Sequence, residues 1–169
     1  MQTEEQARDL FERPLDYPGL VQRRRAQEHV RIWRKPAFDP ESTWAIISDQ
    51  EDWFVRRVVH VREQRGGEPF HDTFGSEGTL PENDAVALLM ELKAISVAPF
   101  VDSSVFGLDG AHYGIAKMGG LYRASISWWC EAPAGWRPLR DWYLRAVETL
   151  ERYLPPSSVP LQARHPWVE

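Results

Sequence analysis

The fold is indicated most clearly by residues 111–129, which read AHYGIAKMGGLYRASISWW. Gly119 and Gly120 are a two-residue turn signal of the kind that joins the strands of a β-hairpin. After this turn, apolar and polar side chains alternate, which is the period of a strand with one buried face. The apolar set consists of Tyr122, Ala124, Ile126 and Trp128. Because so short a turn allows only antiparallel pairing, the stretch predicts a hairpin in an antiparallel sheet.

Further strands are expected on the N-terminal side of this hairpin. Residues 28–34 alternate between apolar and polar side chains, as a half-buried strand does. Residues 43–48 and 53–62 are two apolar runs separated by a polar turn, so they should form a second hairpin. Residues 65–78 contain four glycines and a proline, and we expect them to form a loop.

Three helices are expected around these strands. Thr3 and Gln6 have the spacing of a capping box at the start of a short first helix, which Pro14 should end. Apolar side chains then recur at helical intervals in residues 85–95 and again in residues 139–154. The second of these two patterns continues for four turns and is the clearest helical signal in the chain.

The order of these elements predicts the α+β class. Every strand pair is joined tightly enough to be antiparallel, so we expect an antiparallel sheet of about five strands with three helices packed mainly on one face. No internal repeat is visible, and 169 residues suit one domain of ordinary size. The expected organisation is a single domain, residues 1–169, with an irregular C-terminal tail over residues 155–169.

Composition indicates a globular protein and the cellular compartment in which we expect it. The sequence is 43% hydrophobic and 27% charged, which is typical of a globular protein. The single cysteine, Cys130, cannot form an internal disulfide, and this fits a reducing compartment. The N-terminus lacks the basic start and apolar run of a signal peptide, and no stretch approaches the 18 apolar residues of a membrane span. We therefore expect a cytoplasmic protein with no membrane partner.

The net charge of −5 is unevenly distributed along the chain. Residues 21–65 contain ten basic and seven acidic side chains, whereas both flanking segments are acidic. A basic face on this segment could contact phosphates, so an RNA-binding module is one alternative. Interleaved acidic residues such as Glu28 and Glu41 dilute the basic character, and nucleic acid is not the partner that we expect.

Asp109, His112 and Cys130 raise the question of a Cys–His–Asp triad, because a thiolate nucleophile needs a base and an orienting carboxylate. In the simplest register of the 111–129 hairpin, His112 pairs near Ser127 and not near Cys130. Cys130 also shares the parity of the apolar strand positions, which is typical of a small buried hydrophobe. No catalytic residue is therefore assigned from this group.

His71 lies next to Asp72 in the expected loop and is the other candidate general base. The five histidines show no HxH or HxxxH spacing, and no glycine-rich phosphate loop or nucleophile elbow occurs. We therefore expect no metal and no cofactor. A small hydrolase or transferase that uses Asp109 and His112, or His71, is the chief alternative to a binding function.

The tryptophans suggest where a partner would bind. Trp128 and Trp142 lie on the apolar sides of their elements, whereas some other tryptophans lie on the opposite side of a strand or in a loop, where a large ring needs a covering partner. Tryptophan and arginine dominate the energetics of protein interfaces. The predicted partner-binding residues are Trp33, Trp129, Trp136, Arg123, Asp109 and His112. We expect Trp142 to be buried and Trp136, before the last helix, to be free.

The C-terminal half carries a recognisable pattern. It consists of Leu108-Asp109-Gly110, Tyr113, Ser127-Trp128-Trp129, Gly135-Trp136 and Pro138-Leu139. The pattern resembles one found in small uncharacterised bacterial proteins, some of which resemble immunity proteins of toxin–antitoxin-type competition systems. The resemblance implies a non-enzymatic protein that neutralises a toxin by covering its active surface, and it carries over no catalytic residue. We therefore expect the partner to be another protein.

Overall fold

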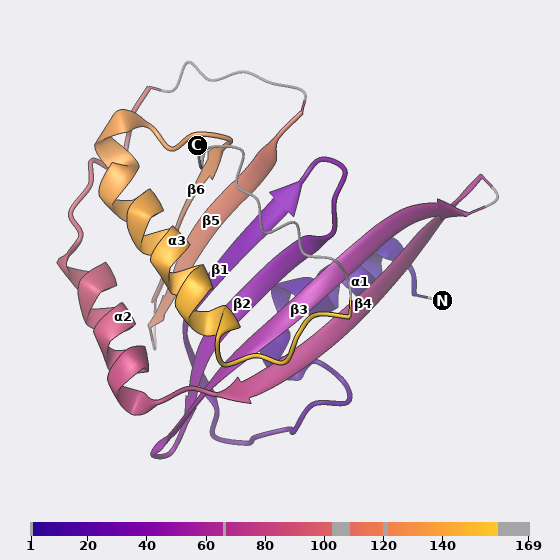
Figure 1. Cartoon of the computed structure of the whole chain (residues 1–169), viewed down its shortest axis with the longest axis horizontal. Helices are drawn as coiled ribbons and strands as arrows, with labels where there is room; N and C mark the ends of the chain where they lie inside the picture. The colour runs from indigo at the N-terminus through magenta and orange to yellow at the C-terminus, as the bar shows by residue number, and fades with distance from the viewer. Residues whose placement is uncertain (1, 66, 103–108, 120–121, 159–169) are drawn as a thin grey trace.

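The computed structural model describes residues 2–65, 67–102, 109–119 and 122–158. Its centre is a six-stranded antiparallel sheet with the strand order β4-β3-β2-β1-β5-β6 (Figure 1). The strands are β1 (Gln27–Pro36), β2 (Glu41–Asp49), β3 (Asp52–Arg65), β4 (Glu68–Thr79), β5 (Ala111–Gly119) and β6 (Tyr122–Trp129). The helices are α1 (Glu4–Glu12), α2 (Glu82–Ala94) and α3 (Arg137–Glu151), with short 3-10 turns η1 (Pro14–Asp16) and η2 (Ala134–Trp136). The predicted α+β class is confirmed.

The sixth strand is β4, and it corrects the expectation of a loop. Its glycines are required by close approaches to other parts of the chain, not by turns. A Cβ atom at Gly75 would overlap the ring of Tyr17, and one at Gly78 would overlap the backbone carbonyl of Tyr153. Both glycines therefore have a packing reason that involves distant segments, and β4 pairs with β3 along its whole length.

The 111–129 hairpin forms as predicted, but its register differs from the simplest one. Gly119 belongs to β5 and pairs with Tyr122. As a result His112 lies opposite Trp129, and Ser127 lies opposite Gly114. The expectation that His112 pairs near Ser127 is therefore wrong by two positions.

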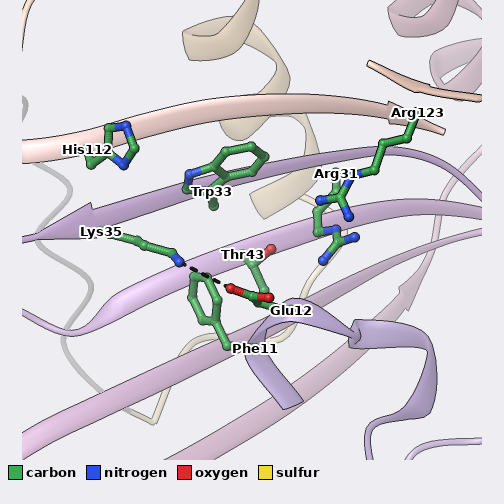
Figure 2. A pocket seen from close by; sticks show the side chains of 8 residues that line it. All are labelled: Phe11, Glu12, Arg31, Trp33, Lys35, Thr43, His112 and Arg123. Atoms are coloured by element: carbon green, nitrogen blue, oxygen red, sulfur yellow. Dashed lines mark ion pairs between the residues drawn. The ribbon is translucent and has the colours of Figure 1, made fainter. Parts of the chain in front are cut away.

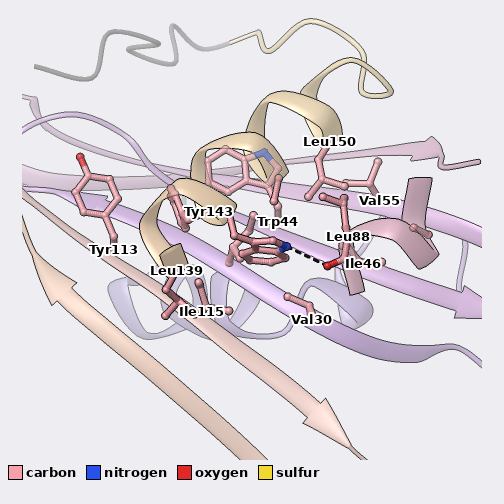
Figure 3. Close-up of a cluster of buried hydrophobic side chains, with 14 of the residues drawn as sticks. Val30, Trp44, Ile46, Val55, Leu88, Tyr113, Ile115, Leu139, Tyr143 and Leu150 are labelled. Atoms are coloured by element: carbon pink, nitrogen blue, oxygen red, sulfur yellow. Dashed lines mark hydrogen bonds between the residues drawn. The ribbon is translucent and has the colours of Figure 1, made fainter. Parts of the chain in front are cut away.

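The two longer helices cover one face of the sheet, and α1 lies on the other (Figure 1). The main core lies between the sheet and α3, where Trp142 is fully buried and its Nε1 donates a hydrogen bond to the Leu88 carbonyl over 2.9 Å. Figure 3 shows this cluster of buried hydrophobic side chains. Trp44, one of its members, donates a hydrogen bond from Nε1 to Glu151 over 2.6 Å. The predicted burial of Trp142 is confirmed.

Trp136 is a correction, because it belongs to this core and is not free. Only 9% of its surface is exposed, and its Nε1 donates a hydrogen bond to the Ala98 carbonyl over 2.8 Å. The η2 turn points the ring inward beneath the segment that follows α2. A partner cannot reach this side chain without opening the core. Trp136 is therefore not a candidate contact residue.

On the opposite face, α1 packs over β2, β3 and β4. Thr3 and Gln6 form the predicted capping box at its start, and Ala7 and Phe11 are buried beneath it. The C-terminal end of α1 reaches β1, where Glu12 lies 3.7 Å from Lys35 Nζ, while most of the helix lies over β2, β3 and β4.

Arg56 connects the segment after α1 to the sheet, and only 2% of its surface is exposed. Its guanidinium donates hydrogen bonds to Glu77 over 2.6 Å and to the carbonyl of Leu15 over 2.6 Å, and it also bonds the carbonyls of Pro14 and Val21. A single buried cation thus joins β3, β4 and the segment that follows α1. This junction fixes where α1 sits on the sheet.

Candidate ligand-binding face

We call the α1-side surface of β1, β5 and β6 the open face. It is built from the strand positions that point away from α3: Glu28, which a β-bulge places on this side, and Arg31, Trp33, Lys35, His112, Gly114, Ala116, Met118, Arg123, Ser125, Ser127 and Trp129. The register aligns these positions in rows across the three strands. One row is Lys35, His112 and Trp129, and the next is Trp33, Gly114 and Ser127.

The position of the Trp33 ring depends on the absence of a side chain at Gly114. A Cβ atom at residue 114 would overlap Cζ2 of the indole, so the ring of Trp33 lies directly over the backbone of β5. Glycine is therefore needed here so that the indole ring can lie close against the backbone of the strand. The consequence is a flat aromatic surface that is partly exposed in the middle of the open face.

A cavity of about 180 Å³ lies between Trp33 and the C-terminal end of α1. It is lined by Phe11, Glu12, Arg31, Trp33, Lys35, Thr43, His112 and Arg123. Figure 2 shows Arg31 and Arg123 beside one another at one end, His112 at the other end, and the Trp33 and Phe11 rings between them. The cavity combines aromatic walls with one strongly cationic end, formed by the two arginines.

The charges around this cavity are unequally matched. Arg31 Nε donates to Glu28 over 2.9 Å, and Lys35 Nζ lies 3.7 Å from Glu12. Arg123 forms no hydrogen bond or ion pair with any residue in the described part of the chain, although its charge acts on Glu28. Burial raises the pKa of Glu28, against the opposing charges of the two arginines. Arg123 is thus the cation that lacks a counterion of its own.

His112 contributes a neutral ring to this surface. Burial lowers its pKa, and the nearby Lys35 ammonium lowers it further. Since an unperturbed histidine already titrates near pH 6.5, the imidazole of His112 is neutral at pH 7. It can therefore donate or accept one hydrogen bond without adding charge.

A second cavity of about 330 Å³ lies on the other side of the Lys35–Glu12 pair. Its lining includes Glu41 and His60, which sequence reasoning missed and which link it to the candidate His71. Glu41 Oε2 lies 3.1 Å from His60 Nδ1, and His60 Nε2 lies 3.0 Å from His71 Nδ1. Burial alone would raise the pKa of Glu41, but the His60 hydrogen bond and the Arg62 charge hold it below its ordinary value. Only the β3–β4 register brings His60 and His71 together, and β4 was not expected.

The structure brings four of the six predicted partner-binding residues onto the open face: Trp33, His112, Arg123 and Trp129. Asp109 is exposed just before β5, where its backbone carbonyl lies 4.0 Å from Cys130 Sγ. Trp136 lies in the core on the far side of the sheet. Arg31 and Lys35 were missed as site residues, although they alternate with Trp33 along the same strand.

No hydrogen bond joins His112 to Asp109 or Cys130 within the described ranges. Among the same residues, no three His, Cys, Asp or Glu side chains are placed to hold a metal ion. The described helices also include none that is long and apolar enough to cross a membrane.

The basic segment of residues 21–65 does not form one surface. Arg56 and Arg57 are buried on opposite faces of β3, where they pair with Glu77 and Glu151 over 2.6 and 2.5 Å. Arg23 is bonded to the same Glu77 through two nitrogens, each over 2.7 Å. These arginines hold the fold together and are not available to phosphates.

We compared the chain with known protein families, curated proteins and solved structures. No protein family, curated protein or solved structure matches the chain. The function is therefore argued from the geometry of the open face.

Proposed function

We propose that this chain is a non-enzymatic binding protein whose open face docks onto an acidic surface of another protein. The observation that carries the proposal is the composition of the face. In a chain with a net charge of −5, its twelve positions include three cations, Arg31, Lys35 and Arg123, and a single acidic residue, Glu28, which is buried and bonded to Arg31. A partner with an acidic surface would therefore be complementary in charge to this face.

The aromatic side chains support a protein as the partner. Trp33 and Trp129 lie on either side of His112 on this face, and tryptophan and arginine are the residues most enriched among interface hot spots. The neighbouring positions of β6 carry the small, exposed side chains of Ser125 and Ser127, which let a partner approach this strand closely. A cationic, aromatic and shallow surface fits an interface better than an enclosed substrate site.

A finer form of the proposal is that the partner is a toxin and this chain is its immunity protein, acting in the cytoplasm. The resemblance of the C-terminal half to immunity-like proteins supports this form, and the free thiol of Cys130 suits a reducing compartment. Neutralisation would then follow from covering the acidic active surface of the toxin with the open face.

The proposal can be tested with a photo-reactive amino acid placed at Ser125 on the open face and, as a matched control, at Met90, which is 59% exposed on α2. We expect one protein to crosslink from position 125 and not from position 90 in the source cell. That protein, once identified and purified, should bind the wild type, and Arg123→Glu should weaken binding by about tenfold or more.

Arg145→Glu is the control for charge, because Arg145 is exposed on α3. It should leave the affinity within about twofold of the wild type. The proposal is overturned if the purified partner binds Arg123→Glu as tightly as the wild type, or if positions 90 and 125 capture the same proteins.

A further inference from the structure

The cavity beside α1 is chemically distinct from the rest of the open face. At one end it places two guanidinium groups together, those of Arg31 and Arg123, as Figure 2 shows. Two like charges at close range repel each other unless an anion lies between them. Arg31 uses its Nε on Glu28, and no described residue hydrogen-bonds its terminal nitrogens. The end of the cavity therefore presents guanidinium donors without an acceptor.

The charge balance indicates how much negative charge the cavity accepts. Three cations surround it, and two of them already face a carboxylate: Arg31 faces Glu28 and Lys35 faces Glu12. The remaining charge is that of Arg123, a single positive charge. One monoanion neutralises it, and a carboxylate is the monoanion whose two oxygens match the planar fork of a guanidinium.

Size argues for a side chain and against a free metabolite. Pockets for drug-sized ligands measure roughly 300–1,000 Å³, whereas this cavity measures about 180 Å³. Its walls are the rings of Phe11 and Trp33, which can pack against the methylene groups of an acidic side chain. The cavity is open toward the same face that is proposed to meet the partner.

The larger cavity next to it lacks this preference. Its lining contains three acidic residues, Glu4, Glu12 and Glu41, and also the basic residues Arg8, Lys35 and Arg62, so its charges balance. Glu41 is further bonded to His60. An anion would gain little there, and the inference concerns only the smaller cavity.

We propose that this smaller cavity is the anchor site for one aspartate or glutamate side chain of the partner. Arg123 and the terminal nitrogens of Arg31 bind the carboxylate, and Trp33 and Phe11 enclose its methylene groups. The inference rests on the proposed protein-binding function and names the group that the partner must supply.

The test uses a small probe, so that it does not depend on finding the partner. Propionate mimics a glutamate side chain, propionamide is its neutral counterpart, and inorganic phosphate is a different anion. We would titrate each into the ¹⁵N-labelled full chain and follow the Nε–Hε signals of Arg31 and Arg123 by NMR. Propionate should shift both signals in a saturable way, and the other two probes should shift them several-fold less.

Arg123→Ala removes the cation that lacks a counterion, and because the residue is exposed the variant should fold normally. It should weaken propionate binding at the Arg31 signal by about tenfold, as expected for one charge-assisted pair. Arg145→Ala removes the same charge from α3 and should have no effect. Equal shifts from phosphate and propionate, or unchanged binding in Arg123→Ala, would overturn the carboxylate assignment.

This experiment separates the two proposals. If a purified partner needs the open face but propionate does not bind at Arg31, the anchor inference fails and the protein-binding function stands. If propionate binds as expected but no protein crosslinks from position 125, the cavity is a carboxylate site and the protein-binding function fails.

Discussion

Replacing Arg56 with methionine tests how the N-terminal segment is held against the sheet. Arg56 is 2% exposed and bonds Glu77 and three backbone carbonyls, those of Pro14, Leu15 and Val21. Methionine keeps most of the volume of the side chain and removes every one of these hydrogen bonds. The variant therefore isolates the polar contribution from the packing contribution.

The expected loss follows from what the substitution leaves behind. Removing one member of a buried ion pair costs about 3–5 kcal/mol, because the remaining charge stays without its partner. Here Glu77 keeps Arg23, which offsets part of the loss, whereas the three carbonyls lose a charged donor. We expect the free energy of unfolding to fall by about 3–4 kcal/mol, a large share of the roughly 5–15 kcal/mol of an ordinary domain.

Urea denaturation followed by tryptophan fluorescence and far-ultraviolet circular dichroism measures this difference. The control is Arg8→Met, which breaks an exposed pair between Arg8 and Glu4 one turn apart on α1 and should cost at most about 0.5 kcal/mol. The reasoning is refuted if Arg56→Met unfolds within about 1 kcal/mol of the wild type. In that case the junction would not determine where α1 lies.

Three other outcomes are expected. Trp142→Ala should lower the free energy of unfolding by about 3–5 kcal/mol, and a thermal melt equal to that of the wild type would contradict the packing of α3. Gly78→Ala should destabilise by about 1–3 kcal/mol in urea, because its Cβ would overlap the Tyr153 carbonyl, whereas Gly135→Ala, with no atom nearby, should be close to neutral. Burial alone would raise the pKa of Glu77, but the hydrogen bonds from its arginine partners hold it below its ordinary value. Its contribution to stability is therefore present above about pH 4.5 and is lost as the pH falls through the lowered pKa. The stability difference between wild type and Glu77→Gln should disappear on acidification, and a difference that grows toward low pH would contradict this sign.

Local patterns predicted the elements whose signals are local. The alternation in residues 28–34 and 122–128 reflects one buried face of a strand, and the helical spacing after Leu139 reflects one buried stripe of a helix. β4 was missed because its glycines look like turn residues. Their cause lies in Tyr17 and Tyr153, more than fifty positions away in each case, which no short window of sequence contains.

The same distinction between local sequence signals and contacts of distant segments applies to the candidate site. Alternation alone places Trp33 opposite the apolar positions of β1, and Arg123 opposite those of β6. It does not reveal that β1 and β5 are neighbours, so the gathering of these residues around one cavity could not be predicted. Trp136 was misjudged for a related reason, since its hydrogen-bond partner, Ala98, belongs to a segment without a periodic pattern.

The pairing of β1 with β5 also has a consequence for how the chain folds. β1 to β4 follow one another through short turns, whereas β5 pairs with β1 across the whole stretch of chain between Pro36 and Ala111. Because closing a long loop is entropically costlier than closing a short one, we expect the four N-terminal strands to assemble first and the last hairpin to dock on them later. The open face spans the boundary between these two parts of the sheet. Trp33 lies on β1, which is expected to assemble first, and His112 and Arg123 lie on the hairpin that docks later. A nascent chain released before β6 would therefore carry only part of the face, and recognition would be reserved for chains that have been completed and folded.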